Sequence, residues 1–409
     1  MATVLPFKAI RPNPSYADQL VFTRRQAESV SGDYTKEDGL KPLKTLLETG
    51  ARLRPETPEG QAMAYQDIRE TLKNLVEKEQ VWRETTPGIY VYEVLHQNYS
   101  QTGIWALTDL ADYTGGQIKI HELTFADSVR RMKNYRQNTS LEGSPVLLTY
   151  PANGAVNAII AVTKVSQPNV TLGNAHSLHR LWKIEDRAIQ EKLMETFRQI
   201  GPVYLADGHH RLESAACLAA QQRKQGLAAY EHLSSLYMAL DQLRIEAYHR
   251  VIVPDCVINK SKLLTMLTGD FYLQESRGNK PILPNELHRM GLYLDGQWYH
   301  LLAKPHTYED RMGTDGWDAA VLQKQVLSKI FGIHDPKADS RLKSAGGEKA
   351  LEEIGAIFQA HPQAIAFTLC PLTISELISA AEEGQILPPK STWVVPKVPY
   401  GLLIHQHEI

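Results

Sequence analysis

Five consecutive residues, Asp207-Gly208-His209-His210-Arg211, bring a carboxylate, two imidazoles and a guanidinium into one short stretch. An apolar run that predicts a strand precedes them, and an alanine-rich run that predicts a helix follows. Such a turn leaves backbone N–H groups unpaired, and the helix dipole favours an anion there. Gly208 permits the tight bend. Arg211 suits two parallel hydrogen bonds to a phosphate, and the imidazoles donate or exchange protons near neutral pH. The stretch therefore predicts a phosphate-binding turn.

Asp207 is the unexpected member of this turn, because a carboxylate repels phosphate. It either orients a histidine or Arg211, or it carries a Mg²⁺ ion that bridges to the phosphate. The alternative without function is that Asp207 caps the helix while both histidines lie at a polar surface turn. Because five such residues come together, we predict a functional site. Asp207 and His209 are the candidate catalytic residues, and Gly208, His210 and Arg211 are expected to bind the ligand.

A second strand-to-helix turn is expected at residues 119–124, ahead of a predicted helix that carries Arg130 and Arg131. In this turn Glu122 is a candidate general base or metal ligand, and His121 is a candidate ligand-binding residue. The alternative is that Glu122 only complements the positive end of the helix dipole. The functional interpretation is favoured if the two turns lie on adjacent strands of one sheet.

Two further places carry candidate ligand-binding residues. Prolines stiffen the loop that holds Lys390, Ser391 and Thr392, and one ammonium with two hydroxyls suits a phosphate or a carboxylate. The alternative there is a proline-rich edge strand with solvated lysines. Arg250 interrupts an apolar strand. A buried arginine needs a partner, so this residue is either structural or lines a pocket.

The composition limits the classes of function. The 409 residues have a formal net charge of −2, and without a basic excess general nucleic-acid binding is disfavoured. No apolar run approaches the ~20 residues of a membrane helix, and no signal peptide is recognised, so we expect a cytoplasmic protein that does not bind membranes. The three cysteines are expected to be reduced and mostly buried. The chain carries no Walker loop, GxGxxG, HExxH or GxSxG motif, and the sequence does not indicate an oligomeric state.

The elements that must position these residues mix strands and helices, which predicts an α+β (mixed α/β) fold. We expect a first domain at 1–254 and a smaller α+β domain at 255–409, whose final strand is a candidate to rejoin the first. Thr124 with Asp127, and Thr373 with Glu376, are expected helix caps. Helices are expected at 17–31, 40–49, 61–80, 124–135, 187–199, 260–268, 317–331, 347–359 and 373–383, and from the 207–211 turn to Gly226. Strands are expected at 89–95, 103–110, 117–121, 145–150, 158–162, 236–241, 244–253 and 364–369, with a hairpin of 290–294 and 298–303 across Asp295-Gly296.

On these motifs the chain resembles the widespread prokaryotic family called domain of unknown function 1015. The likeness covers nearly the whole sequence and includes residues 6–12, 116–124, 181–184, 206–215 and 389–401. Two departures are visible. Members usually carry Pro-Tyr-Asp where residues 21–25 read Val-Phe-Thr-Arg-Arg, and Met-Pro-Gln where residues 387–389 read Leu-Pro-Pro. If the first segment shapes the ligand site, the departure implies altered specificity or lost activity.

The turn from Asp207 to Arg211 is also similar to the phosphate-binding turn of the ParB and sulfiredoxin superfamily, some of whose members are free-serine kinases with a glutamate base. This resemblance implies a nucleotide-binding core and a nucleotide-dependent phosphotransferase acting on a small hydroxyl metabolite, with free serine as a candidate. It would use ATP or ADP with Mg²⁺ on Asp207, and Glu122 would take the hydroxyl proton. Two alternatives stay open. One is a nucleotide- or metabolite-binding regulator without catalysis, and the other is a metal-dependent hydrolase at Asp207, His209, His210 and Glu122.

Overall fold

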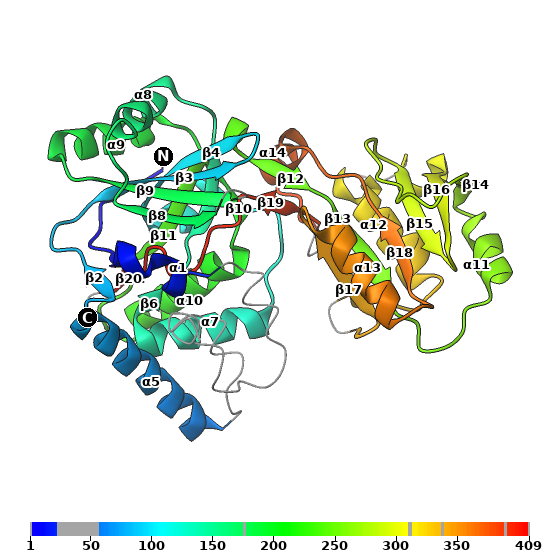
Figure 1. The fold of residues 1–409 in the computed structure, drawn as a ribbon, viewed down its shortest axis with the longest axis horizontal. Coiled ribbons are helices and arrows are strands. Elements are labelled where there is room, and N and C mark those ends of the chain that lie inside the picture. Colours follow the sequence, from blue (N-terminus) through cyan, green and yellow to red (C-terminus); the bar gives the residue numbers. More distant parts are fainter. Residues whose placement is uncertain are drawn as a thin grey trace. The chain divides into compact units, whose positions relative to one another are not determined.

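The computed structural model describes residues 2–22, 57–174, 177–309, 313–336, 339–387 and 391–407. Within these residues the contacts divide the chain into two compact units, both built from strands and helices (Figure 1). The first unit comprises Met1–Ile120, Thr124–Leu243 and Pro396–Ile409, and the second comprises His121–Leu123 and Arg244–Val395. The expected α+β class is confirmed. Among the described residues, no helix has the length and apolar character needed to cross a bilayer.

The first unit is organised around a mixed sheet of eight strands in the order β5-β10-β7-β11-β4-β3-β9-β8. Its strands are β3 (Ile89–His96), β4 (Ser100–Asp109), β5 (Ile118–Lys119), β7 (Val146–Tyr150), β8 (Val170–Asn174), β9 (Ser177–Ile184), β10 (Val203–Asp207) and β11 (His232–Ala239). Two small ladders pair β1 (Ile10–Pro12) with β2 (Val81–Arg83) and β6 (Leu141–Glu142) with β20 (His405–Gln406). Because β5 and β10 are adjacent and parallel, the two turns that the sequence singles out follow neighbouring strands at the same edge of the sheet.

Some helices of the first unit pack on the eight-stranded sheet, and others pack beside it. The helices are α1 (Ala17–Leu20), α5 (Pro58–Glu77), α6 (Leu110–Thr114), α7 (Ala126–Thr139), α8 (Gly154–Thr163), α9 (Arg187–Gln199) and α10 (His209–Lys224), with 3₁₀ turns at Pro14–Tyr16 and Leu240–Gln242. Leu193 and Phe197 of α9 and Leu212 of α10 join the strands in one core. A second core gathers α5 with parts of β1, β2 and β6. In Figure 1 α7 and α10 run side by side.

The second unit contains an antiparallel sheet of six strands in the order β14-β16-β15-β18-β13-β17. These are β13 (Tyr248–Ile252), β14 (Phe271–Glu275), β15 (Arg289–Leu294), β16 (Gln297–Ala303), β17 (Leu342–Gly346) and β18 (Ile365–Thr368), with β12 (Arg244–Glu246) paired to β19 (Trp393–Val395). Its helices are α11 (Lys260–Leu267), α12 (Asp318–Leu322), α13 (Ala350–Ala360) and α14 (Ile374–Glu382), with 3₁₀ turns at Pro305–Thr307 and Gly313–Gly316 and a π-helix at Gln323–Ser328. Alternate residues of β18 enter two cores, Phe367 on one face and Ala366 on the other. The sheet is therefore covered on both faces.

Several expected elements differ from the structure. Residues 158–162 were expected as a strand but lie in α8, whose first turn the Asn153 side chain caps through Ala155 N and Val156 N. Thr124 does not cap α7, since the N-cap position is Phe125 and no side chain caps it. The expected helix at 317–331 is a short α-helix that continues as a π-helix. Of the expected helix at 17–31, residues 17–20 form α1, and residues 23–31 lie outside the described residues, as does the expected helix at 40–49.

The cysteines also differ from expectation. All three are free, but Cys217 and Cys256 are exposed and Cys370 is partly buried. The prediction of mostly buried thiols is therefore wrong for the first two.

Candidate functional site

The turn between β10 and α10 is built by a buried strand that ends at a glycine. Residues 203–206 of β10 are buried, Gly208 is the N-cap of α10 with a φ of 103°, and no side chain caps this helix. Leu212 N and Arg211 N both donate to the Gly208 carbonyl, at 3.0 and 2.9 Å. Small residues, among them Ala215 and Ala219, let α10 pack closely on the sheet. The first turn of this 16-residue helix, which contains two histidines and an arginine, therefore directly follows the carboxyl end of β10.

Asp207 holds two cations at this turn. Its Oδ2 accepts a hydrogen bond from Arg211 Nη2 at 2.8 Å, and its Oδ1 accepts one from Lys397 Nζ at 2.8 Å. Arg211 Nη1 also donates to Ser144 Oγ at 3.0 Å. All three charged side chains are largely but not fully buried, with 12%, 20% and 30% exposed for Arg211, Lys397 and Asp207. One carboxylate between two cations leaves a net positive charge at the helix N-terminus.

Lys397 was not among the predicted site residues. It comes 190 positions after Asp207, so no local pattern connects them. Its position in the proline-containing segment after Val395, close to the predicted Lys390, was the one available signal.

Gly208 is required by both its backbone and its surroundings. A φ of 103° is one that L side chains rarely adopt. A Cβ at this position would lie 2.9 Å from Arg211 Nε and Nη2 and 3.0 Å from Val146 Cγ1. The guanidinium that meets this Cβ is held by Asp207 and Ser144. The turn is thus shaped around the arginine.

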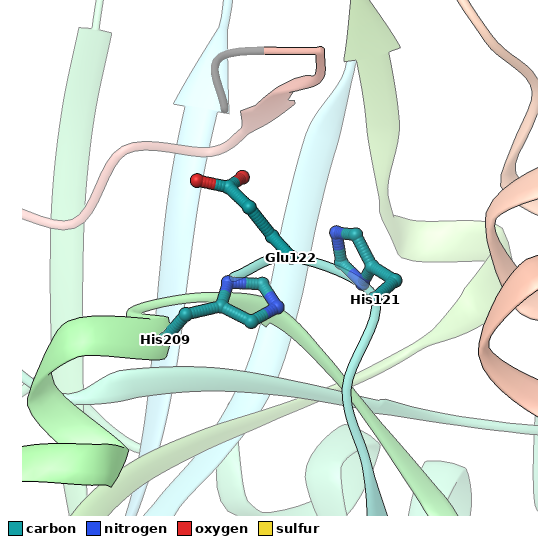
Figure 2. Close-up of side chains that lie close together, drawn as sticks. All are labelled: His121, Glu122 and His209. Carbon is teal, nitrogen blue, oxygen red and sulfur yellow. The ribbon is translucent and has the colours of Figure 1, made fainter. Parts of the chain in front are cut away.

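The two histidines of the turn have different surroundings. His209 is 6% exposed and His210 is partly buried, with its ring 4.8 Å from the Phe125 ring. His121 and Glu122 follow β5 directly, and one ligand atom each of His121, Glu122 and His209 lies within 4.8 Å of the others. Figure 2 shows these side chains close together, His209 from the start of α10 and the other two from the link after β5. Two imidazoles and one carboxylate form a donor set that suits transition metals better than Mg²⁺.

The other predicted residues lie in the second unit or outside the described residues. Arg250 in β13 is 6% exposed, and its Nη1 donates to the carbonyls of Tyr248 at 3.1 Å and His249 at 3.4 Å. Burial lowers its pKa to about 10. Ser391 lines a pocket of the second unit, Thr392 is partly buried, and Lys390 lies outside the described residues. Thr23, in the segment that departs from the family pattern, is also outside them.

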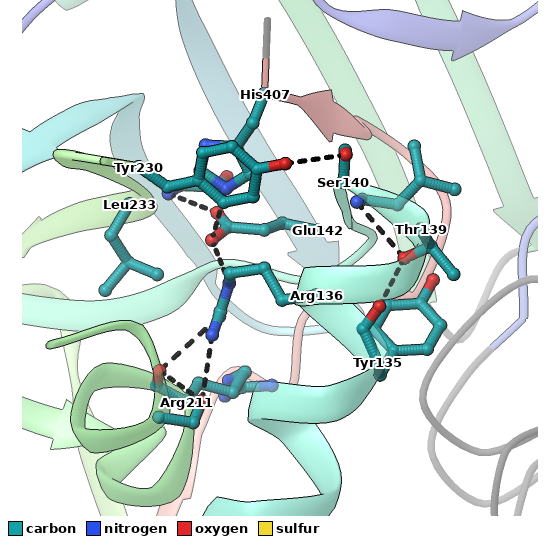
Figure 3. Close-up of polar contacts among 12 residues, drawn as sticks. Tyr135, Arg136, Thr139, Ser140, Glu142, Arg211, Tyr230, Leu233 and His407 are labelled. Atoms are coloured by element: carbon teal, nitrogen blue, oxygen red, sulfur yellow. Dashed lines mark hydrogen bonds and ion pairs between the residues drawn. The ribbon is translucent and has the colours of Figure 1, made fainter. Parts of the chain in front are cut away.

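Behind the turn, a buried ion pair joins four segments of the chain (Figure 3). Glu142 Oε1 accepts from Arg136 Nε at 2.7 Å and is 3.2 Å from His407 Nε2, and its Oε2 accepts from Ser234 N at 2.8 Å. Arg136 Nη1 also donates to Ser214 Oγ of α10 at 2.9 Å. Although burial raises the pKa of Glu142, the charges of Arg136 and His407 hold it well below its usual range. The network fixes the first turns of α10 to α7 and to the C-terminal segment.

Comparison with curated proteins finds no match. Among solved structures, SbnI with a C-terminal truncation from Staphylococcus aureus is 12% identical with a TM-score of 0.38, covering 71% of this chain and 82% of that one. A conserved hypothetical protein from Pyrococcus furiosus is 12% identical with a TM-score of 0.34, covering 72% and 93%. A free serine kinase in complex with AMP is 12% identical with a TM-score of 0.35, covering 73% and 92%. Likenesses this weak carry no argument about function. The sequence itself matches one family over residues 4–325, and the chain therefore belongs to the family described as protein of unknown function, DUF1015.

Proposed function

We propose that this protein is a nucleotide-dependent phosphotransferase that uses the turn between β10 and α10 to bind the phosphates. The observation that carries the proposal is the arrangement at Gly208, where Asp207 holds Arg211 and Lys397 beside the N-terminus of α10. Backbone N–H groups, a helix dipole and two oriented cations together favour a multiply charged anion. The glycine leaves room for the Arg211 guanidinium to lie against the backbone of the turn.

In the proposed reaction, a hydroxyl oxygen of the acceptor attacks the terminal phosphorus of ATP or ADP. The new O–P bond forms as the bond from that phosphorus to the bridging oxygen breaks, and the leaving nucleotide keeps the electron pair. The Glu122 carboxylate takes the hydroxyl proton. Arg211 and Lys397 balance the charge on the transferred group. Free serine is the acceptor that the likeness of the turn to the ParB and sulfiredoxin superfamily suggests.

Asp207 does not fit the role of a Mg²⁺ ligand that the sequence suggested. Both of its oxygens accept hydrogen bonds from cations at 2.8 Å, and these charges repel a divalent ion. The fit is better for a positioning residue that orients Arg211 and Lys397. No step of the proposed reaction passes through a metal on Asp207.

The decisive experiment measures nucleotide binding and turnover on the full chain. ATP, ADP and CTP are titrated by calorimetry, and each is then incubated with serine and other hydroxy acids while product phosphate esters are followed by ³¹P NMR. We expect Arg211→Gln to weaken nucleotide binding at least ~10-fold, since a hydrogen bond to a charged group is worth about 1.5–3 kcal/mol. Arg223→Gln is the matched control, because Arg223 pairs with Glu231 near the other end of the same helix. No nucleotide binding at millimolar concentration would contradict the proposal.

Glu122→Gln distinguishes the enzyme from a regulator that only binds. If Glu122 is the base, the variant keeps nucleotide affinity and loses turnover ~10²–10⁴-fold. If the protein is a regulatory binder, no turnover exists in the parent protein and the variant binds as before.

A metal-dependent hydrolase is the second candidate, and the grouping of His121, Glu122 and His209 within 4.8 Å favours it. Such a site would use the metal to activate a water. Metal analysis of protein purified without chelator tests this candidate. One equivalent of zinc or manganese in the parent protein that is lost in His209→Ala would support the hydrolase over the phosphotransferase.

A further inference from the structure

A small pocket of the second unit surrounds a buried carboxyl group, and the proposed function makes no use of it. Asp318 opens α12, and its side chain is 3% exposed. The space measures about 10 Å³, which is room for one water-sized group. The pocket is lined by Tyr248, Thr314, Trp317, Asp318, Ala319, Ala320, Leu369, Cys370, Leu372, Leu387 and Ser391.

The two oxygens of Asp318 differ in how they are satisfied. Oδ1 accepts a hydrogen bond from the backbone N of His288 at 2.7 Å. Among the residues that the structure describes, no side chain donates to the buried Oδ2, and the backbone N–H of Cys370 lies near enough to the carboxyl group to lower its pKa. A buried carboxylate with so few donors is costly, and the free space beside it is where a further donor would fit.

The lining defines which donor the pocket suits. Two hydroxyl residues, Thr314 and Ser391, and two aromatic residues, Tyr248 and Trp317, line the same space as Asp318. A carboxylate excludes anions, and aromatic rings attract an ammonium group. A volume of about 10 Å³ suits a group of the size of –NH₃⁺ better than the larger guanidinium and quaternary ammonium groups.

We propose that this pocket binds the primary ammonium group of a small amine, with Asp318 Oδ2 as its principal acceptor and the hydroxyls of Thr314 and Ser391 completing the hydrogen bonds. The remainder of the amine would extend from the pocket toward solvent. This site is independent of the phosphate-binding turn.

The ionisable groups around Asp318 set how binding depends on pH. Burial, and to a smaller extent the charge of Glu376, raise the pKa of Asp318 to about 7. His288 Nδ1 lies 3.7 Å from Oδ1, and burial lowers the pKa of that imidazole. Burial and the charge of Asp318 raise the pKa of the Cys370 thiol to about 11, so it stays protonated. Ammonium binding requires the ionised carboxylate and therefore strengthens as pH rises through about 7.

The test uses methylammonium chloride as the probe, with the full chain at pH 8 and constant ionic strength. Its effect on the thermal unfolding midpoint is compared with those of KCl and tetramethylammonium chloride. We expect methylammonium to raise the midpoint by a few degrees at concentrations where the other two salts do not, and the shift to fall at least ~3-fold at pH 6. Asp318→Asn, which keeps the shape of the side chain, should abolish the shift. Asp315→Asn, at an exposed position three residues earlier, should retain it.

Three outcomes would overturn the inference. An equal shift with KCl would assign the site to any monovalent cation, and no shift with any salt would assign it to a water molecule only. A shift that survives in Asp318→Asn would place amine binding elsewhere. Nucleotide affinity is measured on the same samples. Its loss or retention reports on the β10–α10 turn alone, so failure of one proposal is distinguishable from failure of the other.

Discussion

Gly208 and Gly226 lie at opposite ends of α10 and both have positive φ, 103° and 69°. Alanine at either position costs about 1 kcal/mol for the left-handed backbone. A Cβ at Gly226 meets no atom within 4 Å, whereas one at Gly208 meets the Arg211 guanidinium at 2.9 Å. We expect Gly208→Ala to lose more stability than Gly226→Ala, and only Gly208→Ala to lose nucleotide binding, at least ~10-fold. If calorimetry shows that the two variants bind nucleotide equally well, Arg211 is not part of the phosphate-binding turn.

Asp318 makes a prediction about stability and pH. Its pKa is about 7 in the folded protein against an ordinary value of 3.8. An acid whose pKa is raised by folding binds more protons folded than unfolded, so stability falls as pH rises from about 4 to about 7. Asp318→Asn removes this penalty. We expect the variant to match the parent protein near pH 4 and to become the more stable of the two by pH 8.

The measurement is chemical denaturation at several pH values without added amine. Asp315→Asn is the control. Because Asp315 is exposed, its variant should follow the parent protein across the range. A constant difference between Asp318→Asn and the parent at all pH values would contradict the prediction.

At the scale of elements, the contact between α7, α10 and the C-terminal segment depends on Glu142. Removing one partner of a buried ion pair costs about 3–5 kcal/mol because the other charge is left unpaired. We expect Glu142→Gln to lose this much at pH 7, measured by denaturation. The control is Glu191→Gln, whose partner Arg187 is 90% exposed, and which should cost less than about 0.5 kcal/mol.

The ion pair between Glu142 and Arg136 also predicts how the stability of the protein depends on pH. The pKa of Glu142 is lowered by folding from its ordinary value of 4.5. Its contribution to stability is therefore fully present above pH 4.5 and is lost as the pH falls below it. The difference between the parent protein and Glu142→Gln should narrow below pH 4.5. A difference that stays constant down to pH 3 would show that packing, not charge, explains the loss.

Short sequence motifs predicted secondary structure correctly where the motif is typical of a single structure, such as a turn or a helix cap. Asp295-Gly296 forms the expected hairpin, both residues with positive φ, and Thr373 with Glu376 forms the expected capping box. The prediction of a strand at 158–162 was wrong because five consecutive apolar residues are equally compatible with a buried strand and a buried helix. The Asn153 cap five residues earlier was the signal that would have decided it.

The candidate site was predictable only in part for a similar reason. The turn at 207–211 is contiguous, so its residue types and their spacing are visible together in the sequence. The role of Asp207 depends on Lys397, 190 positions later, and the donor set at His209 depends on a strand pairing between β5 and β10. Such long-range pairings are decided by the packing of the whole sheet, which no local pattern records.

At the scale of the whole molecule, the chain leaves the first unit after Leu243 and returns to it at Pro396. The returning segment is well anchored. Leu402, Leu403 and Ile404 are each at most 1% exposed, and Ile404 exchanges two backbone hydrogen bonds with Ile10, of 2.8 and 2.9 Å. It also carries Lys397. The C-terminal residues thus contribute both to the core of the first unit and to its proposed phosphate-binding turn.

Deleting residues 396–409 therefore tests whether the two units unfold independently of each other. Burying three large aliphatic side chains is worth about 1.5–3 kcal/mol each, a large part of the ~5–15 kcal/mol that stabilises a typical domain. We expect the amides of β3, β4, β10 and β11 to lose most of their protection from hydrogen exchange, while those of β13, β15 and β18 keep theirs. Lys397→Met, which removes the ammonium but not the segment, should leave protection in both sheets unchanged and weaken nucleotide binding. Equal loss of protection in the two sheets of the truncated chain would mean that the units fold as one, because a single cooperative transition exposes all strands together.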